Sequence, residues 1–175
     1  MAAVLFGSIF TNLPEGGGDN AYKPRLGFCF FSMFYNTVVQ IQTISMYFDN
    51  RMLYNRERGA KIYGPFPYWL AVWSVWSVFL VFHTAVFCII AYPWSGFKRT
   101  AEAFFCFYGF ILAASLVTYF LAQTISASSP NAQTAMGIYP MCFLTSTLFC
   151  GFYQTLPEVI NWLQHWIPYF SFHRW

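Results

Sequence analysis

Residues 66–92 read FPYWLAVWSVWSVFLVFHTAVFCIIAY, a stretch without any lysine, arginine, aspartate or glutamate. About 20 apolar residues suffice to cross about 30 Å of hydrocarbon as a helix, so the stretch is long enough to span a bilayer. Inside a bilayer the backbone must satisfy its own hydrogen bonds, which favours a helix here. His83 is the only side chain in it that normally titrates near neutral pH. We interpret His83 as a polar residue bonded to a neighbouring helix or the backbone, and a proton or metal role is the alternative.

Three further stretches have the same character. Residues 26–48, 103–125 and 134–156 are free of charge and long enough to span, and turn-forming segments such as GPFP and SASSPNAQ separate the four. The apolar N-terminus, residues 1–12, is shorter than a full span, and we interpret it as the end of a first helix. The sequence therefore predicts an all-α, polytopic transmembrane helical domain with a partial first helix, four full spans and an interfacial C-terminal helix.

The interfacial helix is predicted within residues 157–175. Two prolines bracket a short segment whose apolar residues repeat at i, i+3, i+4 and i+7, namely Val159, Trp162, Leu163 and Trp166. Tryptophan rings favour the depth of the lipid headgroups. We therefore expect this helix to lie in the interface and not to cross the bilayer.

The composition agrees with a membrane domain. Hydrophobic residues make up 58% of the 175 residues, aromatic residues 23% and charged residues only 9%, whereas about a quarter of a soluble domain is charged. The net charge of +3 is too small and too localised for a nucleic-acid-binding face. The cysteines lie in apolar runs without a CxxC pair, so we interpret them as small buried hydrophobic residues and predict no metal site: Cys29, Cys88, Cys106, Cys142 and Cys150.

Charge is concentrated in one short segment, YNRERGAKIYG at residues 54–64. Glu57 and Lys61 stand four residues apart, as a helical ion pair would, and Gly64–Pro65 would end the helix. Cytoplasmic loops carry an excess of lysine and arginine, which favours a cytoplasmic position for residues 49–65. A solvated loop that only anchors the topology is the simpler alternative.

Catalytic patterns are absent from the sequence. It contains no G-x-x-x-x-G-K-[ST] phosphate-binding loop, no HExxH and no paired carboxylates within its spans. We therefore expect no enzymatic activity from this chain alone, and any energy for transport would have to come from another domain.

Several motifs in order carry a family resemblance: LYNRERGAKIY, ISASSPNAQTA, and CGFY followed by LPEVINWLQHWIPYFSFHRW. Together they resemble the transmembrane domain of the G-subfamily ABC exporters, the white-type and pleiotropic-drug-resistance group, along essentially the whole chain. The resemblance implies a type-2 exporter membrane domain of six helices. Two such domains would pair around a central slit.

The resemblance also assigns the segments. Residues 1–12 would be the end of helix one, 26–48 helix two, 50–64 a cytoplasmic coupling helix, 66–92 helix three, 103–125 helix four, 134–156 helix five, and 157–175 the start of the last extracellular loop. We expect the chain to be a fragment or an incomplete gene model, because the sixth helix and the nucleotide-binding domain, which would bind ATP and Mg²⁺, have no counterpart in it.

The resemblance implies three groups of functional residues. A substrate slit would be lined by Phe31, Phe34, Tyr35, Val38, Pro140, Phe143, Leu144 and Thr147. A plug under the outer gate would be formed by Phe152 and Tyr153. Contact with the nucleotide-binding domain would be made by Arg56, Glu57, Arg58 and Tyr63. From the residues alone, the phenylalanines of the slit could equally face lipid or neighbouring helices.

The function implied is the membrane part of an ATP-driven exporter of lipid, sterol or hydrophobic drug-like molecules. It would work as a homo- or heterodimer, surrounded by lipid, in the plasma membrane or an internal membrane. A non-transporting scaffold, or a truncated paralogue that only associates with a full transporter, is the main alternative. A third interpretation is a bacterial-type exporter subunit whose ATPase is a separate chain. It agrees less well with the high aromatic content.

Overall fold

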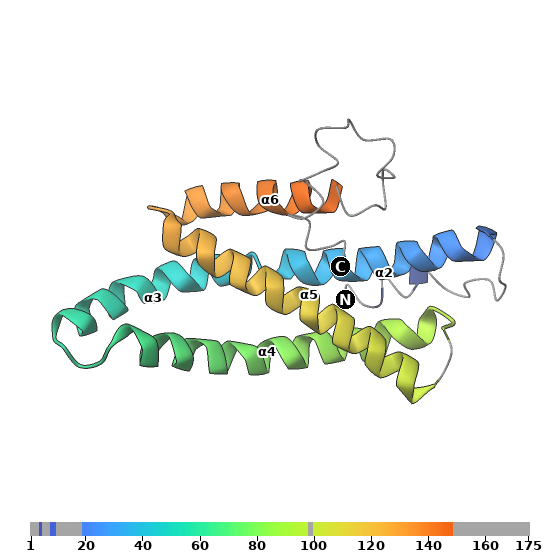
Figure 1. The fold of residues 1–175 in the computed structure, drawn as a ribbon, viewed down its shortest axis with the longest axis horizontal. Coiled ribbons are helices and arrows are strands. Elements are labelled where there is room, and N and C mark those ends of the chain that lie inside the picture. Colours follow the sequence, from blue (N-terminus) through green and yellow to red (C-terminus); the bar gives the residue numbers. More distant parts are fainter. Residues whose placement is uncertain (1–3, 5–7, 10–18, 98–99, 149–175) are drawn as a thin grey trace, which may run out of the picture. The chain divides into compact units, whose positions relative to one another are not determined.

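The computed structural model describes residues 4, 8–9, 19–97 and 100–148 (Figure 1). These residues form helices and contain no strand, which confirms the all-α class. In chain order the helices with defined bounds are α2 (Asp19–Val39), α3 (Gln42–Gly59), α4 (Pro65–Trp94), α5 (Ala101–Ser128) and α6 (Ala132–Leu148).

The chain divides into two compact units. The first unit comprises residues 1–39 and 53–116, and the second comprises residues 40–52 and 117–175. The first therefore holds α2, the last turns of α3, all of α4 and the first half of α5. The second holds the start of α3, the end of α5 and α6. Each unit has its own buried cluster.

The core of the first unit is aromatic. Phe28 of α2 is fully buried, and its ring lies 5.8 Å from Phe107 of α5 and 5.5 Å from Phe97, measured between ring centroids. Tyr92 of α4 lies 5.3 Å from Phe104 in an edge-to-face arrangement. Such pairs each add about 0.5–1.5 kcal/mol beyond the area that they bury. Ring contacts therefore hold α2, α4 and α5 together within this unit.

The core of the second unit is smaller and mostly aliphatic. Ile44 of α3 packs with Ala122 and Ile125 of α5 and with Ala135 and Tyr139 of α6. The alanines allow the helix backbones to approach closely, because they have almost no side chain to separate them. Tyr139 fills most of the remaining space and is itself only 2% exposed.

Helices α4 and α5 have the length and composition of membrane spans. They contain 30 and 28 residues, with mean hydropathies of 2.1 and 2.0 in their most apolar windows. Only 28% and 22% of those windows are buried inside the chain, so most of each surface is apolar and uncovered by protein. Both helices extend slightly beyond the predicted spans 66–92 and 103–125. Helix α6 has 17 residues, and the rest of the predicted span 134–156 lies outside the described residues.

The predicted span 26–48 differs from the structure, which places a turn at Gln40–Ile41 between α2 and α3. The Thr43 hydroxyl donates to the Gln40 carbonyl at 2.6 Å, and the Thr43 amide donates to the same carbonyl at 3.0 Å. A threonine that satisfies the backbone locally offers an alternative to continuous helix, especially among β-branched neighbours. Hydrophobicity alone gave no sign of this break.

The end of α3 also differs from the predicted coupling helix, 50–64, because the helix stops at Gly59. The Ile62 amide donates to the Glu57 carbonyl and the Lys61 amide to the Arg58 carbonyl, at 3.3 and 3.0 Å. These two bonds form a Schellman motif, in which the residue after the cap adopts the left-handed conformation. That residue is Lys61, with a φ of 55°, the only non-glycine residue with positive φ in the described part of the chain.

We expect Lys61→Gly to stabilise this helix end by about 1 kcal/mol, because glycine adopts the left-handed conformation without the steric cost of a Cβ atom. The unfolding midpoint of the purified protein in a neutral detergent, compared with that of Gly59→Ala, measures it. Gly59 lies inside the helix with open space around its Cα, so alanine there is also favourable but acts through helix propensity. A midpoint for Lys61→Gly at or below that of the unmodified protein would contradict the expected relief of strain.

The cysteines only partly follow the sequence prediction. Cys88 is buried and Cys29 is half-buried, but Cys106 and Cys142 are exposed on the surface of the chain. Apolar sequence surroundings do not distinguish the core-facing side of a helix from the side that meets lipid, which explains the error for these two. Cys150 lies outside the described residues.

Candidate functional site

The connection between α3 and α4 brings together three tyrosines and one carboxylate of the first unit. The Tyr63 hydroxyl donates a hydrogen bond to the Glu57 carboxylate. The Tyr54 ring stacks on Tyr68 at a centroid distance of 4.3 Å, and Tyr68 is nearly parallel to Tyr63 at 6.0 Å. Glu57 and Tyr54 lie on α3, Tyr68 lies on α4, and Tyr63 lies between the helices. We call these four residues the tyrosine brace.

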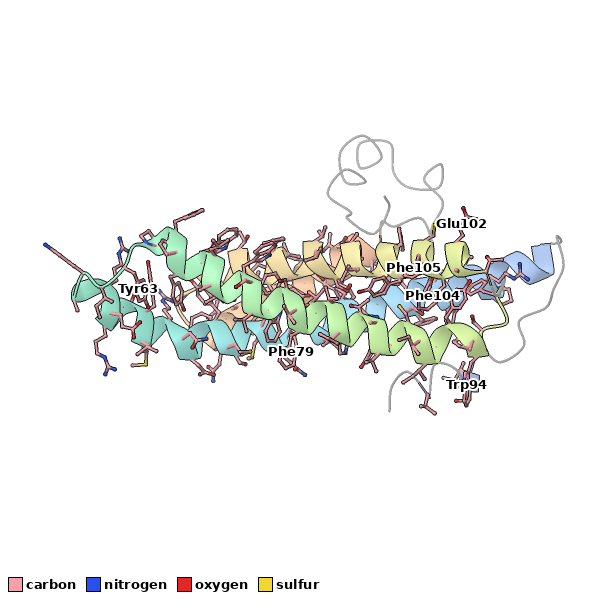
Figure 2. All side chains as sticks on the ribbon, turned by 90° about the horizontal axis from the view of Figure 1, so that it is seen from below. Tyr63, Phe79, Trp94, Glu102, Phe104 and Phe105 are labelled. Atoms are coloured by element: carbon pink, nitrogen blue, oxygen red, sulfur yellow. The ribbon has the colours of Figure 1, made fainter. Side chains whose placement is uncertain are left out.

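The chain builds the tyrosine brace through its local turn chemistry. The Schellman motif at Lys61 reverses the chain direction, and Gly64 with Pro65 at the first position of α4 starts the next helix at once. The turn is therefore short and fixed at both ends. Figure 2 shows Tyr63 at one end of α4, with Trp94 and Glu102 at the opposite end of the same unit.

The hydrogen bond to Glu57 raises the pKa of Tyr63 to about 12, with smaller contributions from burial and from the Glu57 charge. The carboxylate accepts a hydrogen bond from the neutral phenol, and ionisation of the phenol would place two negative charges side by side. The folded pKa thus lies above the usual value of about 10. The bond stabilises the α3–α4 turn fully below pH 10, and its contribution is lost as the pH rises through about 12.

We therefore expect Tyr63 to ionise about two pH units later than an ordinary tyrosine. The phenolate absorbance of the protein near 295 nm, minus that of Tyr63→Phe, isolates this one titration. Glu57→Gln should return the midpoint toward 10, because a neutral amide repels the phenolate far less. A difference curve centred at 10 in the unmodified protein would show that the bond is absent in solution.

Arg56 and Arg58 are not part of the tyrosine brace. Both are exposed, and neither makes an ion pair in the part of the chain that the structure describes. The helical pair Glu57–Lys61 expected from spacing is not formed, because Lys61 lies beyond the end of α3 and Glu57 bonds to Tyr63. Of the four predicted coupling residues, Glu57 and Tyr63 are bonded to each other, and the two arginines are exposed.

Arg51, which precedes the charged segment 54–64, has a different role from the basic residues of that segment. It lies in the second unit, where its guanidinium donates to the Ser129 carbonyl at 3.2 Å and lies 5.6 Å from the Phe48 ring centroid. Ser129 directly follows the last residue of α5, where backbone carbonyls lack helical partners and a cation is favourable. Arg51 therefore ties α3 to the α5–α6 turn.

The predicted slit residues on α2 have mixed surroundings. Phe31 and Val38, seven residues apart, are 39% and 41% exposed, and Phe34 between them is half-buried. Tyr35 turns toward α4, where its ring stacks on Phe87 at 5.1 Å and lies 6.0 Å from the ring of His83. Phe31 and Val38 are thus partly exposed, although the Phe31 ring contacts Phe30 at 5.6 Å, and Tyr35 packs against α4 within the first unit.

The predicted slit residues on α6 belong to the second unit and are also mixed. Leu144 is exposed, Pro140 is half-buried, and Phe143 and Thr147 are buried. The Thr147 hydroxyl donates to the Leu144 carbonyl at 2.9 Å, and α6 continues through Pro140. The two halves of the predicted slit thus belong to different units.

Both plug residues, Phe152 and Tyr153, lie outside the described residues, as does the expected interfacial helix within 157–175. Within residues 19–97 and 100–148 no group of three potential metal ligands comes together.

Sequence reasoning missed Tyr54 and Tyr68, two of the four residues of the tyrosine brace. Their spacing held a usable signal, since Tyr54, Tyr63 and Tyr68 flank a short turn between two helices. An aromatic residue on each side of a helical hairpin can meet across it. The contact between Arg51 and Ser129 had no such signal, because 78 residues separate the two.

Comparisons with known proteins agree with this architecture. The family model described as "ABC-2 type transporter" matches residues 1–175. ABC transporter G family members 12 and 8 of Dictyostelium discoideum are 28% and 30% identical over 95% and 93% of the chain. The ABC-type transporter eriD of Hericium erinaceus is 26% identical over 97% of the chain.

The chain spans only part of these relatives. It matches 26% of the length of each of the two Dictyostelium proteins and 11% of eriD. The match of the whole chain to one family model, with two apolar helices of spanning length, confirms the family that the motifs indicated. The chain therefore belongs to the ABC-2 type transporter family and is an integral membrane domain of the kind found in G-family ABC transporters.

Proposed function

We propose that this chain is the membrane-spanning part of an ATP-driven exporter that moves lipid, sterol or hydrophobic drug-like molecules. The family membership and the matching G-family relatives support the transporter class. One of the matching proteins is named ABC multidrug transporter H, from Aspergillus fumigatus, and is 23% identical over 99% of the chain and 11% of its own length. ATP and Mg²⁺ would be bound by a nucleotide-binding domain, and a second half-transporter would complete the dimer.

The observation that carries the proposal is the tyrosine brace at the α3–α4 turn. A charged turn that only anchors topology needs no internal order, yet Glu57 and Tyr63 are bonded and the Tyr63 ring belongs to a stack with Tyr68 and Tyr54. Such a rigid turn can pass a push from an ATPase domain into α4 without being deformed. Arg56 and Arg58, which are exposed on α3, would contact the acidic or polar surface of that domain.

We expect the substrate to meet the exposed part of the predicted slit. Phe31→Ala should raise the substrate concentration for half-maximal ATPase stimulation about fivefold, because an aromatic contact contributes about 1 kcal/mol. Leu144→Ala tests the α6 side without opening the core, whereas Phe143→Ala removes a buried ring. The measurement is ATPase stimulation of the complete protein in nanodiscs by sterols, phospholipids and dyes.

Phe79→Ala is the matched control for this experiment. Phe79 is 68% exposed on α4, so its removal should leave stimulation unchanged. Unchanged stimulation in Phe31→Ala, Leu144→Ala and Phe143→Ala with every active compound would show that the slit is wrongly assigned. If no compound stimulates a complete protein that hydrolyses ATP, the alternative of a non-transporting scaffold is favoured.

A further inference from the structure

The turn between α3 and α4 carries an exposed surface that the tyrosine brace does not use. Ile62, Phe66 and Trp69 are 67%, 67% and 47% exposed, and Lys61, which precedes Ile62 in sequence, is exposed as well. The ring centroids of Phe66 and Trp69 lie 6.3 Å apart, and Trp69 stacks on Trp73 at 6.2 Å with a 9° interplanar angle. We call Lys61, Ile62, Phe66 and Trp69 the turn patch.

The length of α4 places the turn patch at the depth of the lipid headgroups. Its 30 residues rise about 1.5 Å each, which gives about 45 Å. A bilayer including its headgroup regions is about 40–45 Å thick. The first turn of α4, with Phe66 and Trp69, therefore lies among the headgroups when the helix spans, and Tyr92 and Trp94 occupy the same depth at the other end.

The charge of the turn patch favours an anionic partner. Glu57 is the only carboxylate between residues 53 and 69, and it already accepts the Tyr63 hydrogen bond. Lys61 makes no ion pair in the described part of the chain, and Ile62, which follows it in sequence, is exposed. Lysine beside aromatic and aliphatic side chains suits an interface where the rings lie in the acyl boundary and the ammonium reaches the phosphates.

The backbone at Lys61 is an independent reason to assign a role to its side chain. The left-handed conformation at the residue after a helix cap is usually occupied by glycine. Non-glycine residues in that conformation carry strain, and such strain concentrates at functional positions. Here the strained position holds the one cation of the turn patch.

We propose that the turn patch binds the headgroups of anionic phospholipids in the leaflet beside the α3–α4 turn, with Lys61 as the phosphate-binding cation. Phe66 and Trp69 hold the turn at headgroup depth, and Ile62 inserts toward the acyl chains. This interaction involves none of the four coupling residues. The bound lipid would fix the distance of the turn from the membrane surface.

The experiment measures lipid selectivity directly, without ATP or transport. The complete protein is reconstituted with equal spin-labelled phosphatidylglycerol and phosphatidylcholine, and the ratio of motionally restricted lipids is measured. We expect the unmodified protein to prefer phosphatidylglycerol, Lys61→Arg to keep that preference, and Lys61→Gly to lower it about fivefold, the effect of one basic residue near an anionic surface. Lys61→Gly suits the backbone, so a loss of selectivity cannot be ascribed to misfolding.

Three outcomes would overturn the assignment. The first is equal restriction of both lipids by the unmodified protein. The second is loss of selectivity in Arg56→Ala with retention in Lys61→Gly, which would move the site to the exposed face of α3. The third is unchanged selectivity in Lys61→Gly together with faster ATP hydrolysis, which would indicate that Lys61 contacts an acidic protein surface. Transport that fails while the lipid selectivity is as expected would count against the proposed function alone.

Discussion

Glu57→Ala should lower substrate transport by the complete protein about tenfold while ATP hydrolysis continues and the chain still inserts into the membrane. The substitution removes the acceptor of the Tyr63 hydrogen bond. Loss of this bond lowers the population of the braced turn, and transport, which depends on that turn in the proposed function, falls with it. Transport and ATPase rates measured on the same proteoliposomes give the coupling ratio.

Tyr63→Phe approaches the same bond from the other side. It removes the hydroxyl but leaves the ring stacked near Tyr68. The double substitution should be no worse than either single one if both act through this bond, because their effects are then not additive. Additive losses would mean that Glu57 contacts the ATPase domain directly.

Glu102→Ala is the matched control for Glu57→Ala. Glu102 is an exposed carboxylate in the first turn of α5, at the end of the first unit far from Tyr63 (Figure 2). Its removal changes the net charge equally and should leave the coupling ratio unchanged. Full transport in Glu57→Ala would show that the charged segment only anchors the topology.

Phe28→Ala should destabilise the first unit by about 3 kcal/mol, the largest stability effect that we expect from one substitution. Phe28 is fully buried against Phe97 and Phe107. Phenylalanine-to-alanine changes in cores cost about 3–5 kcal/mol, and the lower value applies because lipid is as apolar as the protein interior, so that lost packing dominates. Denaturant titration in mixed micelles measures the change.

Phe79→Ala again provides the control, because its ring is exposed on α4. Removing a ring that faces lipid leaves no cavity, so we expect a change below about 0.5 kcal/mol. Equal effects of the two substitutions would mean that the aromatic cluster around Phe28 is not formed in the micelle.

The helices themselves could be predicted because apolar, charge-free stretches of sufficient length have one stable form in a bilayer. Their ends could not, since the ends depend on single local contacts. The Thr43 bond to the Gln40 carbonyl breaks the span predicted at 26–48, and the left-handed Lys61 ends α3 before the predicted coupling helix does. Both contacts involve ordinary residues without a glycine or proline signal.

The candidate coupling residues illustrate the same limit. The motif placed Arg56, Glu57, Arg58 and Tyr63 together in sequence and suggested one contact surface. The structure bonds Glu57 to Tyr63 and leaves the two arginines exposed. The slit residues on α2 similarly separate, because Tyr35 stacks on Phe87 while Phe31 remains exposed. Side-chain direction depends on partners from other helices, which spacing along one helix does not reveal.

The sequence by itself determined the helical class, the membrane environment and the family, because composition, hydropathy and ordered motifs are properties of the chain alone. Only the tertiary structure decided which charged and aromatic residues are engaged and which are exposed. The physical reason is that hydrophobic length is summed over many residues, whereas a hydrogen bond such as that from Tyr63 to Glu57 depends on one turn bringing two particular atoms together.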